Sequence, residues 1–238
     1  MKNNKYFLIV FIIILMLLII PVFFMDRTST KSIDALISIN EEYDNLEETE
    51  KVELLKNVHQ NDDIVGTLSI NNSSYSTVIV QAKDNNYYLR KDINGAYARG
   101  GTPFLDYRTN LDTSKKALIY GHNSKYIEMP FKVLENYMDE DYFNNHRYIT
   151  INTSEKEYKY EIFSVYVETD NWGYTSTNYK SNNIWLNHIN NLKNKSIYET
   201  DTTLSKEDQI LILQTCSTNS KYSKYKKKYL LIISRRVG

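Results

Sequence analysis

The chain opens with an apolar segment that no charge interrupts. Residues 6–25 read YFLIVFIIILMLLIIPVFFM, and about 20 such residues in a helix cross a hydrocarbon core roughly 30 Å thick. Lys2 and Lys5 precede the segment, and because basic flanks remain cytoplasmic, the chain beyond Met25 should face outward. The alternative, a cleavable signal peptide, has a shorter apolar core of about 7–15 residues and an Ala-x-Ala-like site. The pattern therefore predicts a cytoplasmic N-terminus at residues 1–5 and a transmembrane anchor at residues 6–25.

Residues 26–60 form a polar stretch in which apolar positions recur at mixed helical spacings. This pattern predicts one or two amphipathic helices, a stalk or cap that leads from the membrane to a folded domain. The apolar positions are Ile33, Leu36, Ile37, Ile39, Leu46, Val52, Leu54 and Leu55.

From residue 61 to residue 238 the pattern changes to short strand-like runs separated by turn-forming residues. Seven such runs in one domain predict a mostly β fold, a closed or nearly closed barrel. Two helical segments interrupt them, at about residues 130–144 and 182–192, and in the second Ile184, Trp185, His188, Ile189 and Leu192 share one face. The runs are IVGTLSI, STVIVQA, KALIYG, YITI, YKYEIFSVYVE, QILILQT and YLLIIS.

The composition excludes several classes of protein. About 210 residues follow the anchor, which fits one domain with a continuous core. The formal net charge of +0 gives no electrostatic reason to expect a nucleic-acid partner. The 21 tyrosines, beside 7 glycines and 3 prolines, are typical of strands and not of disorder. No His and Cys residues cluster at zinc-like spacing, so we expect no metal site.

The one cysteine of the chain, Cys216, directly follows the apolar run Ile210 to Thr215. A lone thiol outside the cell is an intermolecular link, an inert buried residue or a nucleophile. A strand end can hold a side chain rigidly at the rim of a barrel and leave it reachable. Since a free thiol with a pKa near 8.5 is mostly protonated at neutral pH, a nucleophilic Cys216 needs a neighbouring cation or base.

Of the four histidines, His122 is the candidate base. It follows the strand-like run that ends at Gly121, just as Cys216 follows its own run, so the two side chains can meet across a barrel rim. His59 and His146 lie in polar surroundings and are expected to face solvent. His188, on the apolar face of the second helix, is expected to be a packed histidine.

Several short motifs occur in an order and spacing that resemble one known family. They are Asp63-Ile64-Val65-Gly66 with Leu68-Ser69-Ile70, Val80-Gln81 with Asp84-Asn85-Asn86-Tyr87-Tyr88-Leu89, Gly101-Thr102-Pro103-Phe104-Leu105-Asp106-Tyr107-Arg108, Tyr120-Gly121-His122-Asn123, Met129-Pro130-Phe131 and Thr215-Cys216. Together they resemble the class B sortases, membrane-anchored cysteine transpeptidases of Gram-positive bacteria.

The resemblance implies an eight-stranded sortase-type barrel with N-terminal helices and a helix between the sixth and seventh strands. It also implies a reaction. Cys216 cleaves a Thr peptide bond in a C-terminal sorting signal of the Asn-Pro-x-Thr type carried by a surface protein or pilin. The thioacyl enzyme is then resolved by an amino group of peptidoglycan or by a pilin lysine. His122 is the general acid and base of both steps, and no cofactor is required.

The sequence departs from the family at the third catalytic position, an arginine near the start of the last strand. No arginine follows Cys216 before Arg235 and Arg236. If the last strand starts near Lys228 and runs antiparallel to the Cys216 strand, Arg235 lies about 23 Å further along it at about 3.3 Å per residue. Lys228, or Lys226 or Lys224, stands where the arginine is expected, and a lysine supplies charge without a planar bidentate fork. The other interpretation of these lysines is a solvated loop, or one attracted to an anionic cell wall.

Substrate contacts follow from the same resemblance. Asn85 and Leu89 match the segment that lines the groove for the sorting signal, and Trp172 and Tyr174 are candidates for a groove wall. Two rival functions stay open. The chain could be an anchored structural or adhesive protein linked through an intermolecular Cys216 disulfide, or a degenerate sortase that binds signals and turns over poorly.

Overall fold

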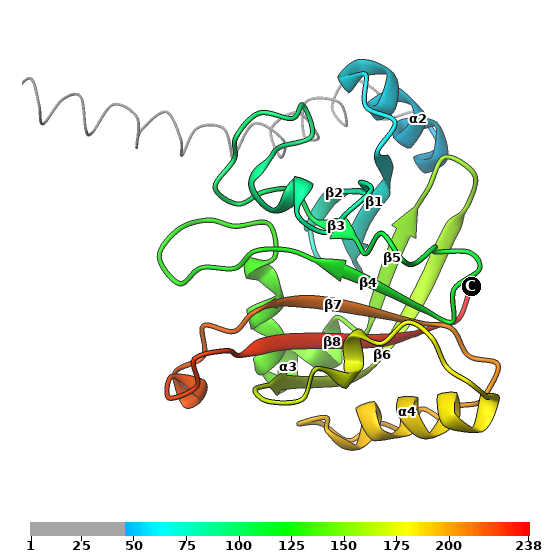
Figure 1. The fold of residues 1–238 in the computed structure, drawn as a ribbon, viewed down its shortest axis with the longest axis vertical. Coiled ribbons are helices and arrows are strands. Elements are labelled where there is room, and N and C mark those ends of the chain that lie inside the picture. The colour runs from blue at the N-terminus through cyan, green and yellow to red at the C-terminus, as the bar shows by residue number, and fades with distance from the viewer. Residues whose placement is uncertain (1–45) are drawn as a thin grey trace, which may run out of the picture.

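Eight strands close into a barrel, which Figure 1 shows as a ribbon. The computed structural model describes residues 46–238, and round the barrel the strands follow the order β1-β2-β3-β4-β7-β8-β6-β5. Two neighbouring pairs, β2 with β3 and β4 with β7, are parallel. The strands are β1 Ile64–Ile70, β2 Ser76–Val80, β3 Phe104–Leu105, β4 Lys116–Tyr120, β5 Tyr148–Asn152, β6 Glu157–Glu168, β7 Ile210–Cys216 and β8 Tyr229–Arg236.

The predicted mostly β barrel is confirmed, and each of the seven strand-like runs forms a strand. The sequence pattern does not predict β3, because only Phe104 and Leu105 pair with neighbouring strands. Two residues are too few to show the alternation of a strand. This short strand nevertheless closes the circle between β2 and β4.

The second predicted helix is α4, Asn182–Asn194, which lies between β6 and β7 as expected. Trp185, Ile189 and Leu192 are buried on one face of it. Ile184 is 49% exposed, so the prediction that it shares this face is wrong. At 3.6 residues per turn Ile184 points about a quarter turn away from the middle of the buried face.

The first predicted helical segment, residues 130–144, divides into two short helices. The 3-10 helix η2 spans Lys132–Met138 and α3 spans Glu140–Asn145. Asp139 between them has an extended backbone, and its side chain accepts a hydrogen bond from the backbone N–H of Tyr142 at 2.9 Å. An N-cap of this kind starts a new helix and so prevents one continuous helix.

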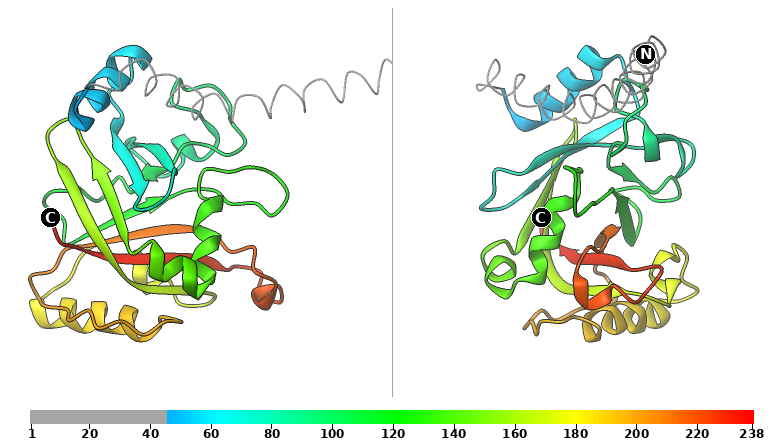
Figure 2. Two further views of the ribbon diagram at one scale, coloured as in Figure 1. Left: turned by 180° about the vertical axis from the view of Figure 1, so that it is seen from behind. Right: turned by 90° about the vertical axis from the view of Figure 1, so that its left-hand side faces the viewer.

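Of the predicted helical segment at residues 26–60, the described part contains α2, Glu48–His59. Its Val52 and Leu55 are buried in a cluster with β1 and β2 residues. α2 and α4 lie on opposite sides of the barrel (Figure 2). The predicted anchor at residues 6–25 lies outside the described residues, and none of the helices within residues 46–238 has the length and apolar character to cross a membrane.

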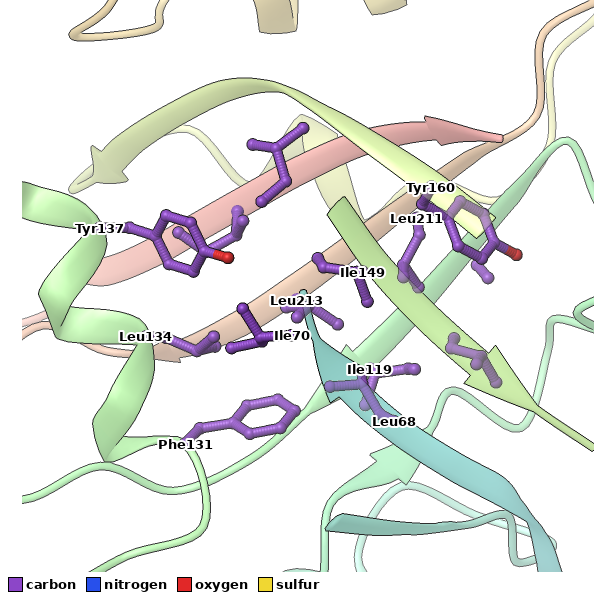
Figure 3. Close-up of a cluster of buried hydrophobic side chains, with 14 of the residues drawn as sticks. Leu68, Ile70, Ile119, Phe131, Leu134, Tyr137, Ile149, Tyr160, Leu211 and Leu213 are labelled. Carbon is purple, nitrogen blue, oxygen red and sulfur yellow. The ribbon is translucent and has the colours of Figure 1, made fainter. Parts of the chain in front are cut away.

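Alternate residues of β4, β7 and β8 face two different hydrophobic clusters. Ile119, Leu211 and Leu213 point into the barrel and pack against β1, β5 and the η2 segment (Figure 3). Leu118 and Ile212 point outward and are covered by Trp185 and other residues of α4. The even-numbered residues of β4 and β7 therefore point outward, and Cys216, at the end of β7, is one of them.

A lysine is buried on this outward face beneath the 3-10 helix η3, Trp172–Thr175, and α4. Lys116 is 2% exposed, and its Nζ donates hydrogen bonds to the carbonyl oxygen of Tyr174 and to the hydroxyl of Tyr179. His188, half-buried, lies with its Nε2 3.5 Å from the same Nζ. No carboxylate of the described residues forms an ion pair with Lys116. Burial lowers the pKa of Lys116 to about 7.

A Lys116→Met variant tests whether this amine loses its charge in the fold. Unfolded lysine has a pKa near 10.4, so between pH 7 and that value the unfolded chain binds the additional proton, and the stability of the wild type rises with pH. Urea titrations give the free energy of unfolding of both proteins. We expect the difference, wild type minus variant, to increase by on the order of 3 kcal/mol between pH 7 and pH 9.5. The exposed Lys180→Met variant is the control, and a pH-independent difference for Lys116 would show that it stays charged.

Candidate active site

The parallel pairing of β4 and β7 places Cys216 and His122 at the same end of neighbouring strands. Tyr120 pairs with Gln214 in this register. The register continues one residue further, since the backbone N–H of Gly121 donates to the carbonyl oxygen of Gln214 at 3.1 Å. The hydroxyl of Thr215 donates to the carbonyl oxygen of Gly121 at 2.8 Å. His122 and Cys216 therefore leave the sheet side by side.

Both residues line one cavity of about 180 Å³ on the outer surface of the barrel. Strands β3, β4, β7 and β8 and the loop around the 3-10 helix η1, Tyr87–Arg90, form its walls. None of the residues that line it carries a carboxylate. They are Tyr88, Leu89, Gly100, Thr102, Phe104, Tyr120, Gly121, His122, Gln214, Thr215, Cys216 and Tyr229.

Glycine is required immediately before His122. A Cβ atom on Gly121 would lie 2.4 Å from the ring of Phe131, which is fully buried. The carbonyl oxygen of His122 in turn accepts a hydrogen bond from the backbone N–H of Phe131 at 3.0 Å. This close packing fixes the direction in which the chain leaves β4, and with it the position of the imidazole.

The hydrogen bonds of His122 select one tautomer of the neutral ring. Its Nε2 lies 3.0 Å from the carbonyl oxygen of Leu89, and since a carbonyl can only accept, Nε2 carries the proton. Nδ1 of the neutral imidazole is then unprotonated and able to act as a base. Burial lowers the pKa of His122 below its usual value, and the charge of Arg90 lowers it further.

Cys216 is a free, exposed cysteine. Desolvation by the surrounding atoms raises the pKa of its thiol, and the charge of Lys228 partly opposes that rise. The two shifts, upward for the thiol and downward for the imidazole, both disfavour a thiolate–imidazolium pair. Both directions favour a neutral thiol and a neutral imidazole in the resting site.

Two residues with no role predicted from the sequence, Asn123 and Glu135, hold the backbone around Cys216. The side-chain amide of Asn123 donates to the carbonyl oxygen of Cys216 at 3.0 Å and to Glu135 at 2.8 Å. Glu135 also accepts from the hydroxyl of Ser217 and the N–H of Thr218. Asn123 follows His122 directly and could have been suspected, whereas nothing in the sequence distinguishes Glu135 from other surface carboxylates.

The predicted substrate contacts are only partly brought to this cavity. Leu89 lines it, but Asn85 does not, and the Asn85 side chain accepts a hydrogen bond from the N–H of Tyr107 at 3.0 Å. Trp172 does not line the cavity, and the centre of its ring lies 5.2 Å from that of the lining residue Tyr229. Tyr174 is buried and donates to the side-chain oxygen of Gln214 at 2.7 Å.

Comparison with known proteins places the chain in a family. The sortase domain matches residues 68–235. The chain belongs to the sortase family. It is similar to sortase B of Listeria monocytogenes, with 35% identity over 69% of this chain and 67% of that protein.

Solved structures agree with this assignment to class B. A Bacillus anthracis sortase B in complex with AAEK1 has a TM-score of 0.73 and 29% identity, over 90% of this chain and 99% of that one. A Staphylococcus aureus sortase B–substrate complex has a TM-score of 0.71 and 25% identity, over 89% of this chain and 94% of that one. The chain is thus a class B sortase, a member of a family of cysteine transpeptidases.

This sortase has no arginine where the resemblance leads one to expect it. Arg235 pairs with Ile210 at the opposite end of β7 from Cys216, and its guanidinium is bound to Glu161 at 3.0 Å. Lys228 lies next to Tyr229, the residue that pairs with Cys216, and its carbonyl oxygen accepts from the N–H of Ser217. Lys224 and Lys226 are exposed, and of the three lysines only Lys228 shifts the pKa of Cys216.

The thiol of Cys216 is expected to ionise above the range of a free cysteine. The rate of alkylation by iodoacetamide should follow the thiolate and rise with pH through a midpoint above that of a cysteine peptide measured alongside. A Lys228→Met variant should have a still higher midpoint, because the cation that favours the thiolate is lost. A midpoint below that of the peptide in the wild type would contradict a neutral resting thiol.

Proposed function

We propose that this sortase is a membrane-anchored enzyme that cleaves a C-terminal sorting signal of the Asn-Pro-x-Thr type and transfers the acyl group to an amine. The acceptor is a peptidoglycan amino group or a lysine of a pilin subunit at the surface of a Gram-positive cell. The observation that carries the proposal is the in-register pairing of β4 and β7, which puts a thiol and an imidazole in one cavity. The similarity to a sortase B solved with its substrate supports a peptide as the first substrate.

The two side chains have complementary roles in this proposal. Cys216 attacks the carbonyl carbon of the Thr peptide bond while its proton passes to Nδ1 of His122. The resulting imidazolium donates a proton to the departing amine, and a thioester remains on Cys216. An incoming amine then attacks the thioester, His122 accepts its proton, and the sulfur leaves. The thioester conserves the reactivity of the acyl group, so the transfer needs no cofactor.

Lys228 is the residue proposed to stabilise the oxyanion. Negative charge develops on the carbonyl oxygen during both steps, and preorganised positive charge stabilises it. The charge of Lys228 lowers the pKa of the Cys216 thiol. Lys228 directly precedes β8, which begins at Tyr229. Asn85 contributes indirectly, by tying the loop before η1 to residue 107, whereas Leu89 contacts the signal itself.

The location proposed for the domain is the outer face of the cell membrane. The support is the uncharged segment at residues 6–25 with Lys2 and Lys5 before it. On this proposal residues 26–60 connect the anchor to the catalytic barrel at residues 61–238.

The central test uses the full-length protein in detergent with a library of Asn-Pro-x-Thr-type peptides. We expect a peptide thioester on Cys216 by mass spectrometry, and transfer to an added amine. The Cys216→Ala variant should form no adduct, and the His122→Ala variant should acylate about 10²–10⁴-fold more slowly. The His59→Ala variant, changed on α2, is the control and should match the wild type.

Other outcomes of the same experiment would favour the rival functions. Acylation of Cys216 without transfer to any amine would indicate a degenerate sortase. A covalent dimer on nonreducing gels that disappears in a Cys216→Ser variant, with no peptide adduct in the wild type, would indicate a structural disulfide.

The role of Lys228 is tested separately from that of the cysteine and histidine. We expect a Lys228→Ala variant to acylate roughly tenfold more slowly, because a half-exposed cation stabilises the oxyanion less than a buried donor does. A Lys228→Arg variant should recover most of the rate, and the remote Lys180→Ala variant should be unaffected. An unchanged rate in Lys228→Ala would remove this assignment.

A further inference from the structure

The charges of this sortase are segregated along its sequence. The formal net charge is +0, from 29 basic and 29 acidic residues. Residues 209–238, however, contain seven of the basic residues and none of the acidic ones. Five of the seven are the lysines Lys221, Lys224, Lys226, Lys227 and Lys228, all within eight residues. The charge balance of the whole chain therefore conceals a strongly basic segment.

This basic segment is the connection between β7 and β8, and it borders the cavity directly. It starts after Cys216 and returns at Tyr229, and both of these residues line the cavity. In Figure 1 the connection, with the short helix η4 Ser220–Tyr222, projects from the same end of the barrel as the loop that follows β4. Any molecule that reaches Cys216 from this side passes the lysines.

The four outer lysines of the connection, Lys221, Lys224, Lys226 and Lys227, are named here the lysine rim. All four are exposed, and no carboxylate of the described residues forms an ion pair with them. The contacts of three of them are with aromatic rings, and the Nζ of Lys227 lies 5.8 Å from the centre of the Trp172 ring. The charges of the lysine rim are thus available to an anionic ligand.

A further cation, Arg90, directly follows the lining residue Leu89 and lowers the pKa of His122. Arg90, exposed at the end of η1, donates a hydrogen bond to the carbonyl oxygen of Arg99. The cavity has no carboxylate among its lining residues. Cations near a pocket with low-dielectric walls attract anions and repel other cations.

We propose that the lysine rim binds a carboxylate carried by the amine acceptor, so that this sortase prefers acceptors that bear a negative charge close to the attacking amino group. The inference rests on the proposed function and extends it from an unspecified amine to an anionic one.

The same charges favour the chemistry of the second step. An amine attacks only in its neutral form, and neighbouring cations disfavour the ammonium form. The nitrogen lone pair forms the new C–N amide bond as the C–S bond of the thioester breaks. The sulfur leaves with the bonding electrons, and the amine proton passes through His122 to the sulfur. The lysine rim thus holds the acceptor by its carboxylate and keeps its amine reactive.

The test compares acceptors that differ only in a carboxylate. Triglycine is matched with triglycinamide, and Nα-acetyl-lysine with its amide, in transfer from the Cys216 thioester of the full-length protein. We expect the carboxylate form to have a KM roughly fivefold lower at low salt, an advantage that shrinks as added salt screens it. A Lys224→Gln, Lys226→Gln, Lys227→Gln triple variant should lose the advantage without a change in the rate of acylation.

A second triple variant controls for net charge. Lys159, Lys180 and Lys206 are exposed lysines. Lys159 and Lys206 lie near the strand ends opposite Cys216. Changing all three to Gln should leave the carboxylate preference intact. Equal KM values for the two members of a pair, a preference for the amide, or transfer to neither member would overturn the inference. Equal transfer to both members of a pair, or a preference for the amide, would still support the proposed function. A Cys216 thioester without transfer to any amine, or no thioester at all, would count against both.

Discussion

The parallel, in-register pairing of β4 and β7 is the constraint on which the site depends. Without it, His122 and Cys216, 94 residues apart in the chain, would have no reason to share a cavity. Parallel neighbours leave a sheet at the same edge, so their terminal residues meet wherever the register holds. Here the register extends past the last paired residues through the bonds of Gly121 and Thr215. The barrel, with α4 on one side and α2 on the other, holds these two strands rigidly.

The electrostatics of the site follow from where these strands end. The cavity is deep enough to shift the pKa of the thiol upward and that of the imidazole downward, yet open enough to leave Cys216 exposed. A neutral pair is less reactive at any instant than an ion pair, but it also avoids the uncontrolled nucleophilicity of a permanent thiolate. The cations around the cavity, Lys228 beside the thiol and Arg90 beside the imidazole, then decide what kind of molecule approaches it.

Much of this architecture could be predicted from the sequence because its signals are periodic or rare. The strand-like runs predicted the barrel, and a single cysteine and a histidine that each end such a run predicted the two central residues. The strand β3 could not be predicted, because two paired residues carry no period. The division of residues 130–144 into two helices depends on the extended backbone of Asp139. The exposure of Ile184 depends on where the buried face of α4 ends.

The supporting residues were less predictable, because they act through contacts between distant parts of the chain. Glu135 reaches the Cys216 loop only once η2 has packed against β8, and Lys116 is distinguished from other lysines only by its burial beneath η3. Asn85 shows the reverse case, since a matching motif led to a residue that braces a loop outside the cavity. A motif identifies the segment, and only the packing decides which of its side chains reaches the site.

The most direct test of the account is the protonation state of His122, read from the 15N chemical shifts of its ring at neutral pH in the wild-type enzyme. The account predicts a neutral imidazole with its proton on Nε2, and a response of these shifts when Cys216 ionises at higher pH, because the two groups share one cavity. A ring protonated on both nitrogens at neutral pH, or one indifferent to the ionisation of Cys216, would contradict it.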